Sequence, residues 1–254
     1  SDIWIWDLNR DILGRRTFEG NASRPIWTPD GRNIIFRRFT GADQQDAGGL
    51  WMIAANGSTQ PEPIFSSREL LWPRAMSSDG RLLFTMHTGE VGSYALSLNK
   101  SEESNAAEQR ASKLNLMPQV NPFASLTVSP NENWLAYVSD ETGTPEIYVR
   151  PYPEVELGKW QASIGGGVAP LWNKNGTELF YHFQGQQFSV TYSEEEINSE
   201  GVPTYIEFDR PASIGQVPLM LGTTLWNQWA HVAQSDEFVG ITGGSSALTQ
   251  AGAL

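Results

Sequence analysis

Residues 27–31 read Trp27-Thr28-Pro29-Asp30-Gly31, and variants of this stretch return along the chain. Asp or Asn stands at the fourth position of every copy, at spacings of 49, 52, 44 and 61 residues. The later copies are 76–80 (MSSDG), 128–132 (VSPNE), 172–176 (WNKNG) and, more weakly, 233–237 (AQSDE). A motif that returns at intervals of this length indicates a repeat architecture.

The motif has the chemistry of a tight turn between two strands. Pro presets the backbone angle φ, and an Asp-Gly or Asn-Gly pair allows the sharp reversal that joins antiparallel strands. Short β-branched and aromatic runs flank the copies, as in Ile34-Ile35-Phe36 and Leu82-Leu83-Phe84. Four strands per unit of about 40–50 residues are typical of a propeller blade, so we predict an all-β β-propeller. Two weakly helical stretches, 105–112 and 194–197, are predicted to be loop insertions.

The repeats divide the chain into four complete blades and two partial ones. The complete blades cover residues 23–66, 71–116, 123–164 and 168–219. The strands at 2–18 and 226–241 are expected to pair into a composite fifth blade, because this closes the ring and removes its exposed edges. The alternative is a chain cut from a larger propeller, and the missing initiator Met also leads us to expect a piece of a longer protein. We predict one propeller domain at 1–242 and a flexible Gly/Ser/Ala-rich tail at 243–254.

The turn motif and its flanking strands resemble the TolB-type, WD-repeat-like propellers of bacteria, whose repeat centres on a Ser-Pro-Asp-Gly hairpin. The match is closest to the propellers that follow the kinase domain in bacterial serine/threonine protein kinases. The segments that carry it include 2–8 (DIWIWDL), 134–139 (WLAYVS), 146–151 (EIYVRP) and 176–181 (GTELFY). The resemblance implies a binding or sensing module in which the motif residues are structural. The sequence contains no kinase motif, so the resemblance implies no kinase activity.

Composition narrows the expected partners and location. The 254 residues include 17 Lys and Arg against 29 Asp and Glu, a formal net charge of −12, which disfavours nucleic acid and anionic membrane surfaces as partners. The chain has no Cys, which excludes disulfides, thiolate catalysis and Cys-ligated metal centres. No apolar run reaches the roughly 20 residues of a membrane-spanning helix, so we expect no membrane insertion. We expect a monomer in the periplasm or another extracytoplasmic location, with the cytoplasm as the alternative.

The motifs that would indicate catalysis or a cofactor are missing from the sequence. There is no Gly-x-Ser-x-Gly nucleophile elbow, and His87, His182 and His231 lie far apart in the chain. The Asp-Gly pairs are explained by the turns they form, and the acidic run 194–196 is expected to be a solvated loop face. We therefore predict no catalytic residue, no metal and no cofactor.

The innermost strand of each predicted blade directly precedes the turn motif and is expected to line the central funnel. The candidate ligand-binding residues at the funnel mouth are Arg24, Trp72, Arg74, Asn121, Trp226, Trp229 and His231. Aromatic side chains beside Arg, Asn and His suit a peptide, a protein or a carbohydrate, although packing between blades is the favoured explanation of the three tryptophans.

The leading functional hypothesis is a non-catalytic module that recognises a peptide, protein or small ligand at the funnel. The alternative is a glycosidase-like hydrolase. Because the innermost segments contain no Asp or Glu, such an enzyme needs two carboxylates from loops, with Glu19 and Glu141 among the candidates.

Overall fold

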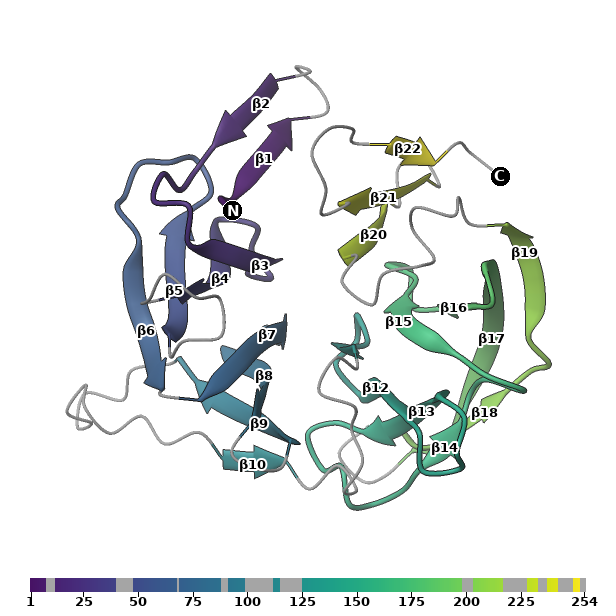
Figure 1. Cartoon of the computed structure of the whole chain (residues 1–254). Helices are drawn as coiled ribbons and strands as arrows, with labels where there is room; N and C mark the ends of the chain where they lie inside the picture. Colours follow the sequence, from purple (N-terminus) through teal and green to yellow (C-terminus); the bar gives the residue numbers. More distant parts are fainter. Residues whose placement is uncertain are drawn as a thin grey trace. The chain divides into compact units, whose positions relative to one another are not determined.

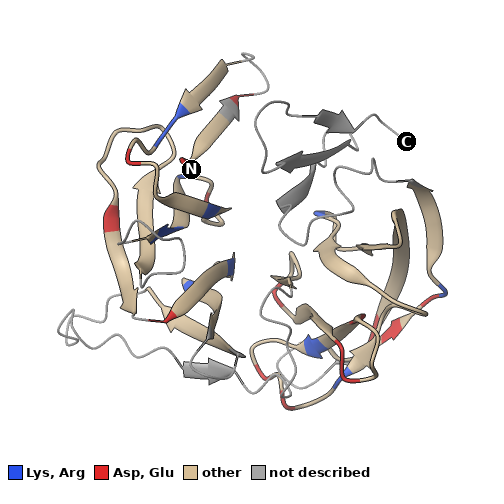
Figure 2. Cartoon of the chain, viewed as in Figure 1, with Lys and Arg blue, Asp and Glu red and all other residues tan. Residues whose placement is uncertain are grey.

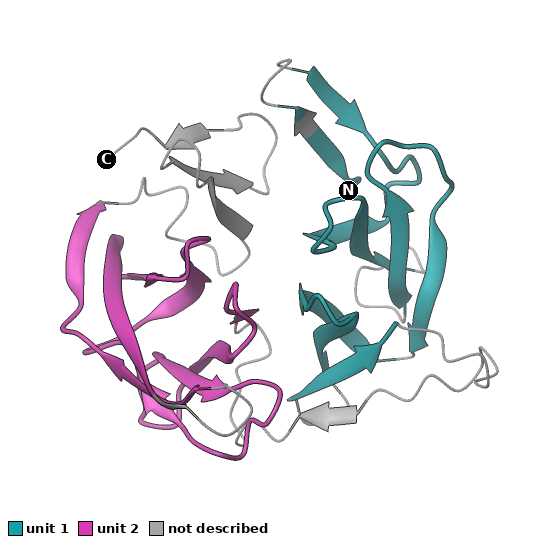
Figure 3. Cartoon of the chain, turned by 180° about the vertical axis from the view of Figure 1, so that it is seen from behind, with its two compact units in different colours: residues 1–114 teal, residues 115–254 magenta. Residues whose placement is uncertain are grey.

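In the computed structural model, every regular element of the described residues is a β-strand. The described residues are 1–7, 12–39, 48–67, 69–87, 91–98, 112–114, 125–197, 203–216, 228–232, 237–241 and 249–251. They divide into two compact units, Ser1–Leu114 and Asn115–Leu254 (Figure 3). Within the described ranges no helical segment has the length and apolar character needed to cross a bilayer.

The first unit contains an N-terminal hairpin and two four-stranded antiparallel sheets (Figure 1). The hairpin pairs β1 (Trp4–Asp7) with β2 (Ile12–Arg15). The first sheet has the order β3 (Ala22–Trp27), β4 (Asn33–Phe39), β5 (Gly48–Ala54) and β6 (Glu62–Ser67). The second has the order β7 (Leu70–Met76), β8 (Arg81–His87), β9 (Val91–Ser97) and β10 (Ser112–Leu114). These sheets coincide with the first two predicted blades.

The second unit continues the same pattern. One sheet has the order β11 (Leu126–Val128), β12 (Trp134–Ser139), β13 (Glu146–Pro151) and β14 (Trp160–Gln161). The next is built from β15 (Val168–Trp172), β16 (Glu178–Phe183), β17 (Gln186–Ile197), β18 (Pro203–Phe208) and β19 (Ala212–Gln216). A last, three-stranded sheet has the order β20 (Gln228–Val232), β21 (Glu237–Ile241) and β22 (Thr249–Ala251).

The repeated motif forms the same turn in the first three four-stranded sheets. In each, the hydroxyl at the second motif position donates a hydrogen bond to the side-chain oxygen at the fourth. The donor–acceptor distances are 2.6 Å for Thr28 to Asp30, 2.5 Å for Ser77 to Asp79 and 2.6 Å for Ser129 to Asn131. The same oxygen accepts the backbone N–H two residues further on, which locks the reversal between the first and second strands. This geometry explains the recurrence of Asp and Asn in the sequence.

The fifth motif position has a left-handed backbone. Its φ is 66° at Gly31, 84° at Gly80 and 67° at Gly176. Glu132 takes the same place in the third sheet with a φ of 60°. Glycine adopts this conformation without a steric penalty, whereas a residue with a Cβ pays for the close approach of its carbonyl oxygen.

The two faces of the first sheet pack against different neighbours. Ile35 belongs to a buried cluster with Leu71 and Leu82 of the second sheet. Ile34 and Phe36 belong to another buried cluster, which includes Ile3 of the N-terminal segment. Because successive strand residues point to opposite faces, β4 connects the first sheet to both neighbours.

The acidic run is part of a strand rather than a loop, so the prediction of a loop insertion at 194–197 is wrong. Residues 186–189 of β17 pair with β19, whereas residues 192–197 pair with β18. We call the paired segments 192–197 and 203–208 the β17–β18 arm. Glu194 Oε1 accepts hydrogen bonds from Trp134 Nε1 at 2.7 Å and from Asn131 Nδ2 at 2.8 Å. These contacts anchor the arm to the preceding sheet, so Glu194 is not the solvated side chain that we expected.

The organisation of the two ends of the chain stays a prediction. The hairpin β1–β2 belongs to the first unit and β20–β22 to the second, and each forms its own sheet. Their union in one composite blade, and the single domain at 1–242, are therefore not tested. Within the segment predicted as a flexible tail, Thr249–Ala251 forms β22 and pairs with β21. The expected insertion at 105–112 lies outside the described residues, apart from its last residue, which begins β10.

Candidate functional site

The first strands of the sheets carry five of the predicted funnel residues, and three of these strands are irregular. Their pairing with the second strand shifts between Ser23 and Ile26 in β3, between Pro73 and Ala75 in β7, and between Val168 and Leu171 in β15. Such bulges change the direction in which a side chain points and are frequent beside functional sites. Arg24, with a φ of 58°, and Arg74 lie within the irregular stretches of β3 and β7.

Three arginines meet on β3, β4 and β7 of the first unit. Figure 2 shows basic residues, in blue, on these strands. Arg37 of β4 stands opposite Ser23 of β3, next to Arg24. Burial, and after it the charge of Arg37, lowers the pKa of Arg24 to about 10. Burial, and after it the charge of Arg24, lowers the pKa of Arg74 to about 9. Arg24 thus lies within electrostatic reach of both Arg37 and Arg74, and all three guanidinium groups remain cationic at neutral pH.

Aromatic rings and a hydroxyl hold two of these guanidinium groups in place. The Arg37 guanidinium carbon lies 4.2 Å from the centre of the Phe39 ring and 5.7 Å from that of Trp72. Arg37 and Trp72 are both buried, with exposed fractions of 5% and 6%. Arg74 Nε donates a hydrogen bond of 3.1 Å to the Thr85 hydroxyl. We call Arg24, Arg37, Trp72 and Arg74 the inner-strand cluster.

The structure thus brings together Arg24, Trp72 and Arg74 of the predicted site. Trp72 is also packed in the interior, as its second interpretation proposed. Asn121 and Trp226 lie outside the described residues. Trp229 and His231 lie on β20, whose side chains are not described.

Sequence reasoning missed Arg37. Its signal was present, because Arg37 follows the buried run Ile34-Ile35-Phe36 and shares a strand face with Ile35 and Phe39. Alternation alone did not show that this face turns towards β7.

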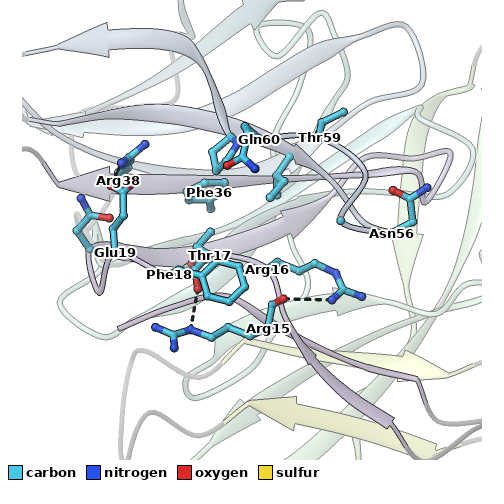
Figure 4. Close-up of a pocket in the computed structure, with 14 residues that line it drawn as sticks. Arg15, Arg16, Thr17, Phe18, Glu19, Phe36, Arg38, Asn56, Thr59 and Gln60 are labelled. Atoms are coloured by element: carbon cyan, nitrogen blue, oxygen red, sulfur yellow. Dashed lines mark hydrogen bonds and ion pairs between the residues drawn. The ribbon is translucent and has the colours of Figure 1, made fainter.

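A separate cavity of about 300 Å³ lies between the N-terminal segment, β4 and the β5–β6 turn (Figure 4). Its floor includes the buried Phe36, and Phe18, which is 71% exposed, lies at its side. Asn56, Thr59 and Gln60 supply polar groups from the β5–β6 turn. A cavity of this volume is at the lower limit of those that hold small ligands, which are typically about 300–1,000 Å³.

Two of the arginines that line this cavity form ion pairs with carboxylates of the chain. Arg38 forms an ion pair with Glu19, and its guanidinium carbon lies 4.3 Å from the Trp51 ring centre. Arg15 Nη2 lies 2.5 Å from Asp2 Oδ2. Since Arg37 and Arg38 are consecutive on β4, they point to opposite faces of the sheet, and the cavity is distinct from the inner-strand cluster.

The second unit contains buried polar groups that serve the sheet interior. The Ser163 hydroxyl donates to the Glu146 carboxylate and accepts a 2.7 Å hydrogen bond from the Ile147 N–H. His182 is buried on β16, and burial lowers its pKa to about 4, so the imidazole is neutral at pH 7. In the part of the chain that the structure describes, no group of three or more His, Asp or Glu could hold a metal ion.

No family model and no curated protein sequence matches this chain. Its structure is similar to that of TolB from Acinetobacter baumannii, with a TM-score of 0.60, 15% identity and coverage of 95% of this chain and 57% of that chain. The fold is a β-propeller. It is also similar to a gluconolactonase from Xanthomonas campestris, with a TM-score of 0.59, 12% identity and coverage of 95% and 76%. A chain of the nidogen/laminin complex matches with a TM-score of 0.52, 7% identity and coverage of 94% and 84%.

These similarities establish the fold of this propeller and no more, because the identities are low. The propeller spans little more than half the length of the TolB chain. Its function must therefore be argued from its own side chains.

Proposed function

We propose that this chain is a non-catalytic β-propeller that binds a peptide or protein partner through the inner-strand cluster. The observation that carries the proposal is the Arg37 guanidinium held by two aromatic rings, with Arg24 and Arg74 beside it on bulged strands. Tryptophan and arginine dominate the energetics of protein interfaces, because they combine a large apolar surface with directed hydrogen-bond donors. Side chains that are already fixed lose little entropy when a partner binds.

The comparisons support this proposal through proteins of the same fold. One similar chain comes from a complex of two proteins, nidogen and laminin, and another is TolB. A carbohydrate is the alternative ligand, and an extracytoplasmic monomer remains the expected form. The link to propellers that follow bacterial kinases stays a prediction from the resemblance.

The cavity beside Phe18 is less favourable for the hydrolase alternative. Among the described residues that line it, Glu19 is the one carboxylate, and it is paired with Arg38. Glycosidases of the common mechanisms need two carboxyl groups flanking the scissile bond. Glu141, another candidate acid, forms an ion pair with Lys159 in the second unit.

Selection of peptides on the full chain tests the proposed function. A library of displayed linear peptides is panned against the wild-type protein, and the enriched peptides are measured in solution by calorimetry. We expect enriched peptides whose affinity falls at least tenfold in Arg24→Gln and Arg74→Gln. Arg32→Gln is the matched control, because Arg32 is exposed on the β3–β4 turn and its loss changes the net charge equally. Peptides that bind all four proteins equally would contradict binding at the cluster.

A further inference from the structure

We propose that the cavity beside Phe18 is a second binding site, which takes one pyranose ring of a neutral sugar. The cavity lies within the first unit, between the N-terminal segment, β4 and the β5–β6 turn (Figure 4). The members of the inner-strand cluster are not among the described residues that line it. The inference therefore goes beyond the proposed function and does not rest on it.

The size and the floor of the cavity suit a single ring. Its volume of about 300 Å³ is at the lower limit for small ligands, so a compact ligand fits it better than an extended peptide. The buried side chains of Phe36 and Ile53 make part of its lining apolar. A ligand that fills this space therefore needs an apolar face as well as polar groups.

Phe18 offers a flat apolar surface that the protein holds in place. Its side chain is 71% exposed, and the Arg15 guanidinium carbon lies 5.0 Å from the centre of its ring. That guanidinium is fixed in turn by Asp2 Oδ2, 2.5 Å from Nη2, and by the backbone oxygen of Thr17, 2.8 Å from Nε. The C–H groups on one face of a pyranose stack on the negative face of an aromatic ring. A ring that is fixed before binding loses little entropy when a ligand stacks on it.

Three amide side chains around the cavity suit the hydroxyl groups of a sugar. Asn21 Nδ2 donates a hydrogen bond of 3.0 Å to a backbone carbonyl oxygen, and Asn56 Oδ1 accepts one of 2.9 Å from the Ser58 N–H. One such bond fixes the direction of an amide that has two donors and an acceptor in total. Gln60 supplies the third amide, and Figure 4 shows it across the cavity from Phe18. Each sugar hydroxyl both donates and accepts, so groups that do the same match it.

The charges at the cavity favour a neutral ligand. Arg15 is paired with Asp2, and Arg38 with Glu19. Arg16, the third arginine of the lining, donates from Nε to a backbone carbonyl oxygen at 2.5 Å. A charged ligand would have to compete with these bonds, whereas the hydroxyl groups of a neutral sugar add to them. Since Glu19 is the one carboxylate among the described lining residues, we expect the sugar to be bound and not cleaved.

Ligand-observed NMR titrations of the full chain test this inference with defined small molecules. The probes are the methyl pyranosides of glucose, galactose, mannose and N-acetylglucosamine. Sorbitol is the control that has the hydroxyl groups without a ring face, and cyclohexanol is the control that has a ring with a single hydroxyl. At the efficiency usual for small ligands, one sugar ring should bind with a Kd of about 1 mM.

We expect at least one pyranoside to bind with this affinity, and sorbitol and cyclohexanol to bind at least tenfold more weakly. Phe18→Ala should lose at least tenfold in affinity, whereas Phe18→Tyr keeps the aromatic face and should stay within about twofold of wild type. Gln60→Ala should lose affinity by several-fold. Trp27→Ala is the matched control, because Trp27 is 52% exposed on β3 and is not among the described lining residues. Thermal unfolding of each variant verifies that it is folded.

A free monosaccharide and the end of a polysaccharide present the same ring, and two trisaccharides distinguish them. Cellotriose and maltotriose are titrated beside methyl glucoside. Tighter binding of a trisaccharide, with the same dependence on Phe18, means that the ring belongs to a chain. Equal or weaker binding means that the site takes a single sugar.

Three results overturn the inference. The first is that no pyranoside or trisaccharide binds at concentrations up to about 50 mM, and the second is that Phe18→Ala binds as tightly as wild type. The third is that methyl glucuronide binds at least tenfold more tightly than methyl glucoside, which would make the ligand acidic. Peptide binding at the inner-strand cluster is measured through Arg24 and Arg74, so the proposed function holds or fails independently of these titrations.

Discussion

Removal of the Glu194 carboxylate should detach the β17–β18 arm from the preceding sheet. Glu194 Oε1 accepts hydrogen bonds from Trp134 Nε1 and Asn131 Nδ2, and Trp134 is completely buried. In Glu194→Ala the indole N–H loses its acceptor, which costs about 1–3 kcal/mol. We expect a loss of about 2 kcal/mol in the free energy of unfolding. For a urea m-value of about 2 kcal/mol/M, the midpoint of unfolding falls by about 1 M.

Urea titration followed by tryptophan fluorescence measures this change, with two matched variants. Glu194→Gln keeps an oxygen that accepts from Trp134, so it should lose less than about 1 kcal/mol. Glu195→Ala removes the exposed neighbouring carboxylate and should stay within about 0.5 kcal/mol of wild type. If Glu194→Ala unfolds at the same urea concentration as Glu195→Ala, or if the Gln and Ala variants of Glu194 are equally destabilised, the Glu194 carboxylate does not anchor the arm.

Three further predictions concern stability. Gly31→Ala should lower the free energy of unfolding by about 1 kcal/mol, because the added Cβ meets open space and only the left-handed backbone opposes it. Glu132→Gly should raise the free energy of unfolding by about 0.5–1 kcal/mol, because the left-handed backbone at this position suits glycine. If the two variants unfold at equal urea midpoints, this prediction is contradicted. Burial lowers the pKa of His182 to about 4, so the unfolded chain takes up its proton first and stability falls as pH drops from about 6.5 towards 4, by about 3 kcal/mol at most. A His182→Gln variant with the same dependence in this window would exclude His182 as its source. Burial raises the pKa of Tyr181 to about 12, so the free energy of unfolding should fall as pH rises from about 10 to 12. Unfolding titrations of Tyr181→Phe should show a smaller fall in this range, and a fall as large as that of the wild type would contradict the assignment to Tyr181.

The strands were predictable because their information is local. The Thr28–Asp30 and Ser77–Asp79 hydrogen bonds join residues two positions apart, so the turn chemistry is visible in the sequence itself. The turns then place the flanking apolar runs as antiparallel strands, and four such runs per repeat indicate a blade.

The arm was not predictable, because its stability comes from contacts distant in sequence. Three consecutive glutamates have low strand propensity and suggest a loop. In the structure, Glu194 stands opposite Ile206 and bonds to Trp134, 60 residues away. Tyr205 contacts Trp160 edge to face, with ring centroids 5.7 Å apart. These tertiary contacts override the local preference.

Part of the candidate site was predictable because its information is local, and part was not because it depends on strand pairing. Arg24 and Arg74 follow from their place just before the turn motif, which the repeat makes visible. Trp72 was predicted to lie in the loop that enters this segment, and the structure places it in β7 itself. Arg37 lies on the second strand, and its direction depends on the pairing of β4 with both β3 and β5. A shift of that pairing by one residue would turn Arg38, instead of Arg37, towards β7.

The continuity of β17 has a consequence for hydrogen exchange. Its residues 186–189 belong to the sheet through β19, and residues 192–197 belong to the arm through β18, with no break in the strand between them. Opening of the arm therefore strains a strand that the sheet also uses. The amide protons of the arm should exchange with solvent in the same cooperative event as those of β16 and β17, rather than at the fast rate of a surface loop.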